Sequence, residues 1–191
     1  TLIKRFSETR RAHPLSQDGL TITEAIQLER ALLSDLSQDS HRIDTSHLSA
    51  NTLRHWVLQF ASHAPSALTI IIQSFGFKHG LPLDADFVFD ARCLPNPYYD
   101  HHLRPLTGRD LPVIRFLEKE ELVNLFYQDV ELFLSRWLPV AKQEQRQYLT
   151  IAIGCTGGQH RSVYLVERLA RHLKNNWTVM LRHREHPNHA D

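Results

Sequence analysis

One segment toward the C-terminal end constrains the fold of this chain more than any other. Apolar residues at 148–153 predict a buried strand, and residues 162–173 have the spacing of a helix. Between them lies the turn Gly154–Ser162, which reads GCTGGQHRS. A turn from a strand into a helix N-terminus directs backbone N–H groups and partial positive charge toward one spot. We therefore expect a phosphate group to bind here, with the guanidinium of Arg161 on its oxygens.

The residues around this segment have the pattern of an α/β domain. Further strands are predicted at 68–75, 87–90 and 178–181, and the first of these is rich in isoleucine. Apolar residues at intervals of three and four predict a helix over 122–137. A long proline-containing loop is expected from residue 95 to 112. Strands that alternate with helices predict a mainly parallel sheet with flanking helices.

The N-terminal third has a different pattern and is predicted to be mostly helical. Helical spacing is present at 21–36 and 53–60, and residues 42–46 resemble a short strand. These elements do not make a closed sheet, so we interpret residues 1–64 as the C-terminal part of a domain that starts before this sequence. A proline-containing linker then separates them from a second domain at 65–191.

Composition narrows the class of protein. The 191 residues carry a formal net charge of +1, which neither requires nor excludes a nucleic-acid partner. No apolar run approaches the roughly 20 residues of a membrane helix, so no membrane partner is expected. Two cysteines, Cys93 and Cys155, make no disulfide framework, which favours a cytoplasmic location. The 13 histidines make the surface charge sensitive to mild acid.

The turn also permits an enzymatic interpretation. Cys155 and Arg161 have the Cys-x5-Arg spacing of cysteine-dependent phosphatases, in which a thiolate attacks the bound phosphate. The general acid would be one of three aspartates, Asp84, Asp86 or Asp90. Gly154 stands where those enzymes normally have histidine, so phosphate binding without catalysis is preferred and the phosphatase is kept as the alternative.

Other segments offer groups for a ligand. Lys78 and His79 follow a predicted strand, where loops of open α/β sheets bind ligands, although a tight turn with a solvated lysine is an equal alternative. Asp90 and Arg92 are two residues apart and would share a face. Tyr98 could stack on a base or a sugar, or contact its own domain.

Metal sites are not expected. Three nearby aspartates raise the possibility of Mg²⁺, but turn capping is preferred for Asp84 and Asp86, whereas Asp90 is suited to accept a ligand hydroxyl. The histidines have no cysteine or carboxylate at the spacing of a zinc site.

Several longer motifs occur together and in order. They strongly resemble the RapZ family of bacterial RNase adaptor and nucleotide-binding proteins, also called YvcJ-like. The motifs are Ser74–Gly80, Asp84–Asp86, Phe89–Arg92, Leu94–Pro97, Leu103–Gly108 and Gly154–Val163, with Ile3–Leu15 similar to the family's N-terminal kinase-like domain.

This resemblance implies a fold and a function. The C-terminal domain would resemble a phosphofructokinase subdomain, sense glucosamine-6-phosphate, and present a small regulatory RNA to ribonuclease E. The family's ATP or GTP site uses an N-terminal P-loop. No Gly-x4-Gly-Lys-Ser/Thr occurs in this sequence, so neither a nucleotide cofactor nor nucleotide hydrolysis is expected of these 191 residues. A homo-oligomer is implied.

The resemblance also implies two sets of site residues. The sugar phosphate would contact Asp90, Arg92, Tyr98, Cys155, Thr156, Gly157, Gly158, His160 and Arg161. RNA would contact Lys78, His79, Arg104 and Arg161.

The chain departs from the family pattern at three places. Gln159 replaces a lysine that some members carry, and Tyr98 replaces a histidine near the sugar. The C-terminal residues 182–191 lack the lysine-rich tail of the enterobacterial members, a loss expected to weaken RNA binding.

Overall fold

The computed structural model describes residues 2–9, 12–40, 42–45, 48–61, 68–144 and 146–185. The chain divides into two compact units, Thr1–Ser46 and His47–Asp191, which are described separately. Among the described helices, none combines the length and apolar character needed to cross a membrane.

The first unit is helical. It contains α1 (Leu2–Thr9), α2 (Ile22–Leu32) and α3 (Ser34–Asp39), so the predicted helix over 21–36 is interrupted at Leu33. A capping box between the Thr21 and Glu24 side chains and backbone begins α2. The strand predicted at 42–46 is wrong, because residues 42–45 have no regular secondary structure and residue 46 lies outside the described residues.

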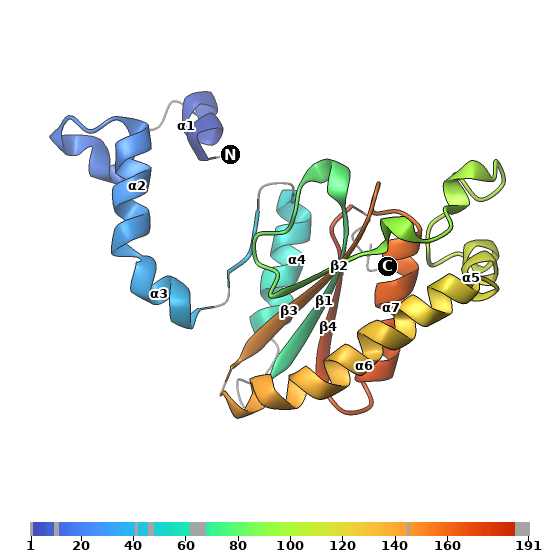
Figure 1. The fold of residues 1–191 in the computed structure, drawn as a ribbon. Helices are drawn as coiled ribbons and strands as arrows, with labels where there is room; N and C mark the ends of the chain where they lie inside the picture. Colours follow the sequence, from blue (N-terminus) through green and yellow to red (C-terminus); the bar gives the residue numbers. More distant parts are fainter. Residues whose placement is uncertain are drawn as a thin grey trace. The chain divides into compact units, whose positions relative to one another are not determined.

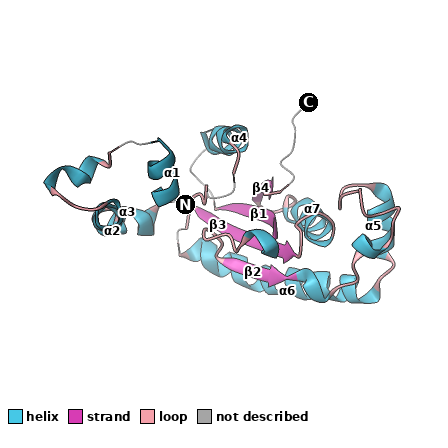
Figure 2. Ribbon diagram, turned by 90° about the horizontal axis from the view of Figure 1, so that it is seen from above, coloured by secondary structure: helices cyan, strands magenta, loops and turns pink. Residues whose placement is uncertain are grey.

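The second unit is built on a sheet of four parallel strands (Figures 1 and 2). The strands are β1 (Thr69–Gly76), β2 (Phe87–Asp90), β3 (Tyr148–Cys155) and β4 (Thr178–His183), in the order β2-β3-β1-β4. The predicted parallel α/β architecture is confirmed. β3 and β4 each extend two residues beyond their predicted ends, so the glycine and cysteine that open the turn belong to β3.

Helices cover both faces of this sheet. The helices of this unit are α4 (Ala50–Ala61), α5 (Leu111–Glu118), α6 (Glu121–Gln143) and α7 (Arg161–Leu173), of which α5 lies beyond the end of the sheet. Figure 2 shows α4 on one side of the sheet and α6 on the other. The main core joins α6 and α7 to the sheet residues on their side, such as Ile70, Ile72 and Ile151. Apolar side chains on both faces fit a parallel sheet that is buried on both sides.

The helix α4 packs against the face opposite this core. Trp56 is only 3% exposed, and its ring lies 4.3 Å from the guanidinium carbon of Arg182 on β4. Phe60 packs edge-on against Tyr148 at 5.0 Å between ring centroids. Although α4 falls within residues 1–64, it is therefore held by the sheet of the second unit.

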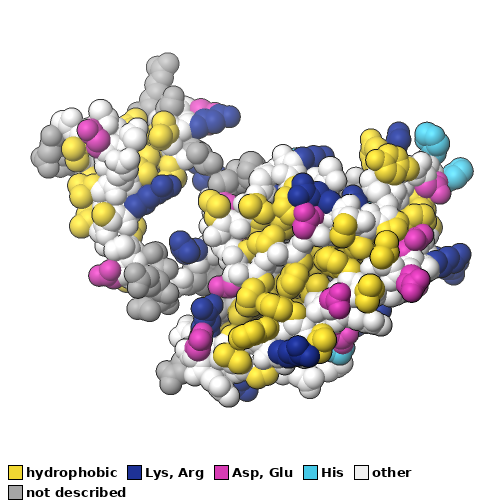
Figure 3. Space-filling view, in the orientation of Figure 1, with side chains coloured by type: hydrophobic (Ala, Val, Ile, Leu, Met, Phe, Trp, Pro, Cys, Tyr) yellow, Lys and Arg dark blue, Asp and Glu magenta, His cyan; other side chains and the backbone are white. Residues whose placement is uncertain are grey.

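The outer surface of α6 is unusually apolar. Figure 3 shows hydrophobic side chains gathered along this helix. Four of its large apolar residues are more than half exposed: Leu122, Leu125, Leu132 and Trp137. On its inner side, Leu134 and Leu138 are fully buried in the core, so this helix carries apolar residues on both sides.

Candidate anion-binding site

The predicted turn lies where two central strands end. β3 ends at Cys155, α7 begins at Arg161, and β1 pairs beside them down to Gly76. Among the described residues, no side chain caps the N-terminus of α7. Its first N–H groups thus remain available to an anion, and the helix dipole favours negative charge there. We call Gly154–Ser162 the anion cradle.

Glycines make the close packing of the cradle possible. Gly158 has φ +74°, a left-handed conformation that glycine adopts without strain. A Cβ atom on Gly76 would lie 2.7 Å from the carbonyl carbon of Gly157, so the end of β1 touches the cradle directly. A Cβ atom on Gly154 would lie 2.4 Å from the Phe75 ring, which leaves no room for the histidine of the phosphatase pattern.

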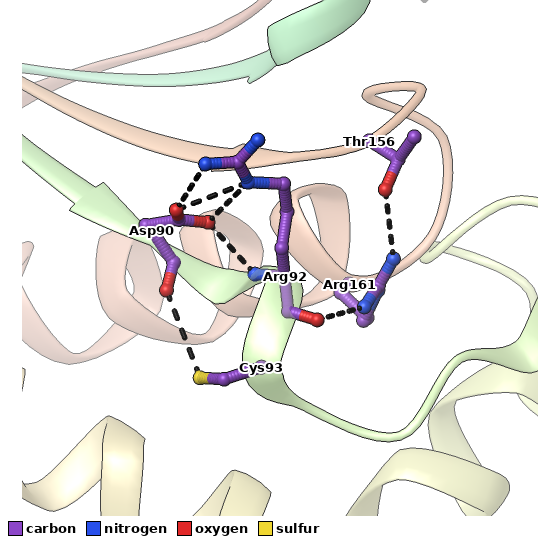
Figure 4. A network of polar contacts seen from close by, with 5 residues as sticks. All are labelled: Asp90, Arg92, Cys93, Thr156 and Arg161. Atoms are coloured by element: carbon purple, nitrogen blue, oxygen red, sulfur yellow. Dashed lines mark hydrogen bonds and ion pairs between the residues drawn. The ribbon is translucent and has the colours of Figure 1, made fainter.

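Arg161 forms a buried wall of the cradle (Figure 4). One terminal nitrogen, Nη1, donates to the carbonyl oxygens of Arg92 and Leu94, at 2.9 Å each. The other, Nη2, donates to Thr156 Oγ1 at 3.4 Å. Only 4% of Arg161 is exposed, and its Nε has no partner among the described groups. The guanidinium therefore fixes the loop after β2 to the cradle and carries its charge into the site.

Asp90 and Arg92 lie beside the cradle and bind each other. Asp90 pairs in register with Gly154, and the Arg92 side chain donates to both Asp90 carboxylate oxygens at 2.7–3.0 Å (Figure 4). This hydrogen bonding lowers the pKa of Asp90, with a smaller contribution from Arg161. Arg92 also lies over the Phe77 ring at 3.9 Å. Both side chains are about half exposed, so the pair can still meet a ligand.

The remaining cradle side chains are largely committed to protein contacts. Cys155 is 3% exposed, with Sγ 3.2 Å from Ser162 Oγ. His160 Nε2 lies 3.1 Å from the Leu103 carbonyl oxygen, and burial lowers the pKa of its imidazole.

Gln159, one of the departures from the family pattern, has a structural role. The side-chain amide of Gln159 donates to the carbonyl oxygens of Arg104 and Leu106 at 3.0 and 2.7 Å. In return, the backbone N–H of Gly108 donates to the backbone carbonyl oxygen of Gln159 at 2.9 Å. A lysine could not reproduce this pattern while also projecting its charge into the site. Gln159 therefore attaches the loop at 103–110 to the cradle.

Exposed cations lie at the rim of the cradle. Lys78 Nζ is 3.8 Å from the position that a Cβ of Gly157 would occupy. Arg104 stacks on Tyr98 at 4.4 Å and donates to its carbonyl oxygen at 3.2 Å. Lys78 and Arg104 therefore put positive charge on the solvent side of the site, and the exposed His79 lies next to Lys78 in the chain.

Asp86 lies at the other end of the sheet. Its carboxylate accepts from Thr150 N at 2.7 Å and from Arg146 Nη1 at 3.1 Å. Asp84 contributes negative charge near the buried Arg182. In the part of the chain that the structure describes, no three histidine, cysteine or acidic side chains gather as metal ligands.

Sequence reasoning missed a second layer behind the cradle. Arg184 donates to the carbonyl oxygens of Gly76 and Gly80 at 3.1 and 2.7 Å, and to the Glu185 carboxylate at 3.0 Å. Glu185 lies directly against Gly158. In the sequence these two residues look like part of a charged tail. Only the pairing of β4 with β1 brings them to the cradle.

The fold and the cradle together define a class of domain: a parallel α/β sheet in which an uncapped helix N-terminus lies beside a buried arginine. Comparison with protein families places the chain more closely. Residues 68–187 match the RapZ C-terminal domain, and residues 1–63 match the RapZ-like N-terminal domain. The chain therefore belongs to the RapZ family.

Similar proteins occur in several bacteria. A nucleotide-binding protein of Laribacter hongkongensis is 60% identical over 186 residues, which cover 97% of this chain and 67% of that protein. Nucleotide-binding proteins of Chromobacterium violaceum and Methylobacillus flagellatus are 56% and 57% identical over 185 residues. These cover 97% and 96% of this chain and 66% of each relative. The chain thus spans about two thirds of the length of these relatives.

Proposed function

We propose that residues 65–191 form a metabolite-sensing domain that binds a sugar phosphate, glucosamine-6-phosphate, at the cradle. The uncapped N-terminus of α7 behind the Gly157–Gly158 turn carries this proposal. Backbone N–H groups, the fixed charge of Arg161 and the nearby Lys78 ammonium supply complementary charge for a phosphate.

The sugar would extend toward the end of β2. Asp90 is ionised at neutral pH, and its hydrogen bond with Arg92 lowers the pKa of its carboxyl below the ordinary value of 3.8. A half-exposed carboxylate can accept hydrogen bonds from sugar hydroxyls and attract an ammonium group. Tyr98, which is 47% exposed, offers a ring for contact with the sugar.

The same domain would bind a small regulatory RNA and present it to ribonuclease E in the cytoplasm, within a homo-oligomer. Exposed Lys78, His79 and Arg104 at the rim support phosphate contacts. Arg161 is too buried to be a primary RNA contact, and its burial favours the metabolite role. Relatives are named nucleotide-binding proteins. We assign that activity to the family's P-loop, a motif that these 191 residues do not contain.

A cysteine phosphatase is less well supported. Asp86 is held at Thr150, five residues along β3 from Cys155, which is about 17 Å at the usual rise of a strand. Asp90 is close enough, but a general acid needs a raised pKa and that of Asp90 is lowered. The Cys155 thiol is buried against Ser162.

Calorimetric titration with glucosamine-6-phosphate tests the metabolite claim. Gly157→Val should abolish binding without unfolding the protein, because only atoms of Lys78 lie within 4 Å of the added Cβ. Lys78→Ala should weaken binding roughly tenfold by removing a charge-assisted contact. Lys119→Ala, an exposed lysine beyond α5, is the matched control and should change nothing. Unchanged binding by Gly157→Val would refute the cradle as the site.

RNA binding needs its own experiment. The affinity for a structured small RNA should fall as salt rises, and Lys78→Ala should reduce the slope of log affinity against log salt by about 1. A slope near zero in the parent chain would contradict a phosphate-contact mode.

A further inference from the structure

A second polar cavity opens beside α7, with a lining different from that of the cradle. It has a volume of about 490 Å³ and lies between α7, α5, the start of α6 and the loop before α5. This volume is in the range of small-molecule sites. Three arginines and two glutamates line it, with Tyr164 and Ile114 as its apolar wall.

The central cation of this cavity is held in place by neutral groups. Arg168 Nη1 donates to Asn124 Oδ1 at 2.8 Å and to the Tyr164 hydroxyl at 3.1 Å, and the guanidinium stacks on the Tyr127 ring at 3.9 Å. Asn124 is itself fixed by donating to the carbonyl oxygens of Glu118 and Glu120. Among the described side chains, no carboxylate forms an ion pair with Arg168. An oriented cation without an anionic partner is poised for an anion from outside.

The two glutamates offset only part of the charge of the three arginines, and Glu167 is engaged outside the cavity. The Glu167 carboxylate is directed to His183, whose Nε2 lies 3.1 Å away and whose Nδ1 lies 2.8 Å from Ser74 Oγ. The pKa of Glu167 is lowered mainly by this hydrogen bond, with further contributions from Arg109 and Arg171. The Tyr164 hydroxyl has a raised pKa because it is buried, so it stays a neutral hydrogen-bonding group.

Two sets of contacts connect the cavity to the cradle. Gly108 at its wall donates to the Gln159 carbonyl, and a Cβ there would lie 2.2 Å from the His160 carbonyl oxygen. On the other side, Glu167 holds His183, the residue before Arg184 and Glu185 that support the cradle. A ligand that displaces either wall of the cavity would therefore shift the cradle residues through these contacts.

We propose that this cavity is an effector site for a small anion, a phosphate or carboxylate carried on an apolar or ring-shaped body. Arg168 binds the anion as a rigid fork, exposed Arg171 adds charge at the mouth, and Ile114 and Tyr164 contact the body. Occupancy of the cavity changes the affinity of the cradle for its own ligand. This last step rests on the function proposed above, whereas binding in the cavity does not.

Binding can be tested with phenyl phosphate, benzoate and inorganic phosphate, titrated calorimetrically into the Gly157→Val chain, whose cradle is blocked. The two ring-bearing probes should bind more tightly than inorganic phosphate, and their ranking identifies phosphate or carboxylate as the preferred head group. Arg168→Met should weaken binding roughly ten- to a hundredfold, because it removes charge-assisted hydrogen bonds. Arg136→Gln, an exposed arginine of α6 outside the cavity, is the control.

Three results would overturn the binding proposal. These are no binding of any probe up to roughly 10 mM, equal binding by Arg168→Met and the parent, or equal loss in Arg136→Gln. Because Arg168 packs on Tyr127, Arg171→Gln provides a variant at an exposed position, and it should weaken binding roughly two- to fivefold.

The effector role has a separate readout. In the parent chain, saturating the cavity should change the affinity for glucosamine-6-phosphate severalfold, and the reverse titration must show the same factor. The effect should vanish in Arg168→Met. An unchanged affinity would remove the effector role, while failure of glucosamine-6-phosphate to bind at all would instead remove the proposed function.

Discussion

The two units of this chain differ in how far their apolar side chains are buried. Among the described residues of the first unit, Ala25 and Ile26 are the buried apolar ones, while Leu32 and Leu36 are each 66% exposed. In the second, a continuous core fills the space between the sheet and α6 and α7, and many of its members are fully buried. The described helices of the first unit have no sheet of that unit beside them, and these leucines are exposed. The comparison teaches that the larger buried core of these 191 residues belongs to the second unit, which also carries the cradle.

The largest expected effect follows from this contrast. Leu138→Ala removes a fully buried side chain from the core of the second unit and should lower the free energy of unfolding by about 2–5 kcal/mol. Leu32→Ala removes the same atoms from an exposed site and should change it by less than about 0.5 kcal/mol. Urea unfolding followed by far-ultraviolet circular dichroism measures both, because this signal comes from the helices of both units. Similar losses in the two variants would contradict the contrast.

A smaller loss of stability is expected from alanine at one glycine of the cradle, Gly154, than from Leu138→Ala, and almost none at another, Gly157. Gly154→Ala places a methyl group 2.4 Å from the Phe75 ring and should cost about 1–3 kcal/mol of stability. Gly157→Ala has only Lys78 atoms nearby, at 3.8 Å or more, and should leave the unfolding midpoint almost unchanged. If both variants unfold alike, the tight packing of β3 against β1 is not what requires glycine at the first position.

Acid should reveal the buried link between α7 and β4. The pKa of Glu167 is lower in the folded chain than its ordinary value of 4.5, chiefly because of its hydrogen bond to His183. Its stabilising contribution is therefore complete above pH 4.5 and is lost as the pH falls through the folded pKa. Glu167→Gln should be less stable than the parent at neutral pH, and the difference should narrow below pH 4.5. Thermal unfolding across this range measures it, and a constant difference would argue against the assignment.

The smallest effect on the stability of the whole chain is expected at Thr21, the N-cap residue of α2. Thr21→Ala removes the capping box of α2 and should cost that helix about 1 kcal/mol. Because α2 belongs to the weakly packed unit, hydrogen exchange should quicken in α2 and remain unchanged in β1 and β3. Faster exchange throughout the chain would show that the two units unfold together.

Much of the second unit can be read from the sequence because its signals are local. The apolar run that forms β3, the periodicity of α6 and the glycines of the cradle each act through neighbouring residues. The prediction of a strand at 42–46 was wrong because a local pattern is not enough for a strand. A short β-like segment forms a strand only where a sheet edge can pair with it. The helix over 21–36 was predicted without its break at Leu33, where one residue leaves helical geometry.

Local sequence thus determined the anion cradle itself, because a strand, a glycine turn and a helix N-terminus are consecutive in the chain. Tertiary structure decided what surrounds it. Arg161 is a buried wall because carbonyl groups some 70 residues away accept its hydrogen bonds, with Leu94 67 positions distant. Arg184 and Glu185 support the cradle because β4 pairs with β1, and Arg168 faces an open cavity because α5 and α7 converge there. Such contacts depend on the packing of distant segments, which no local pattern encodes.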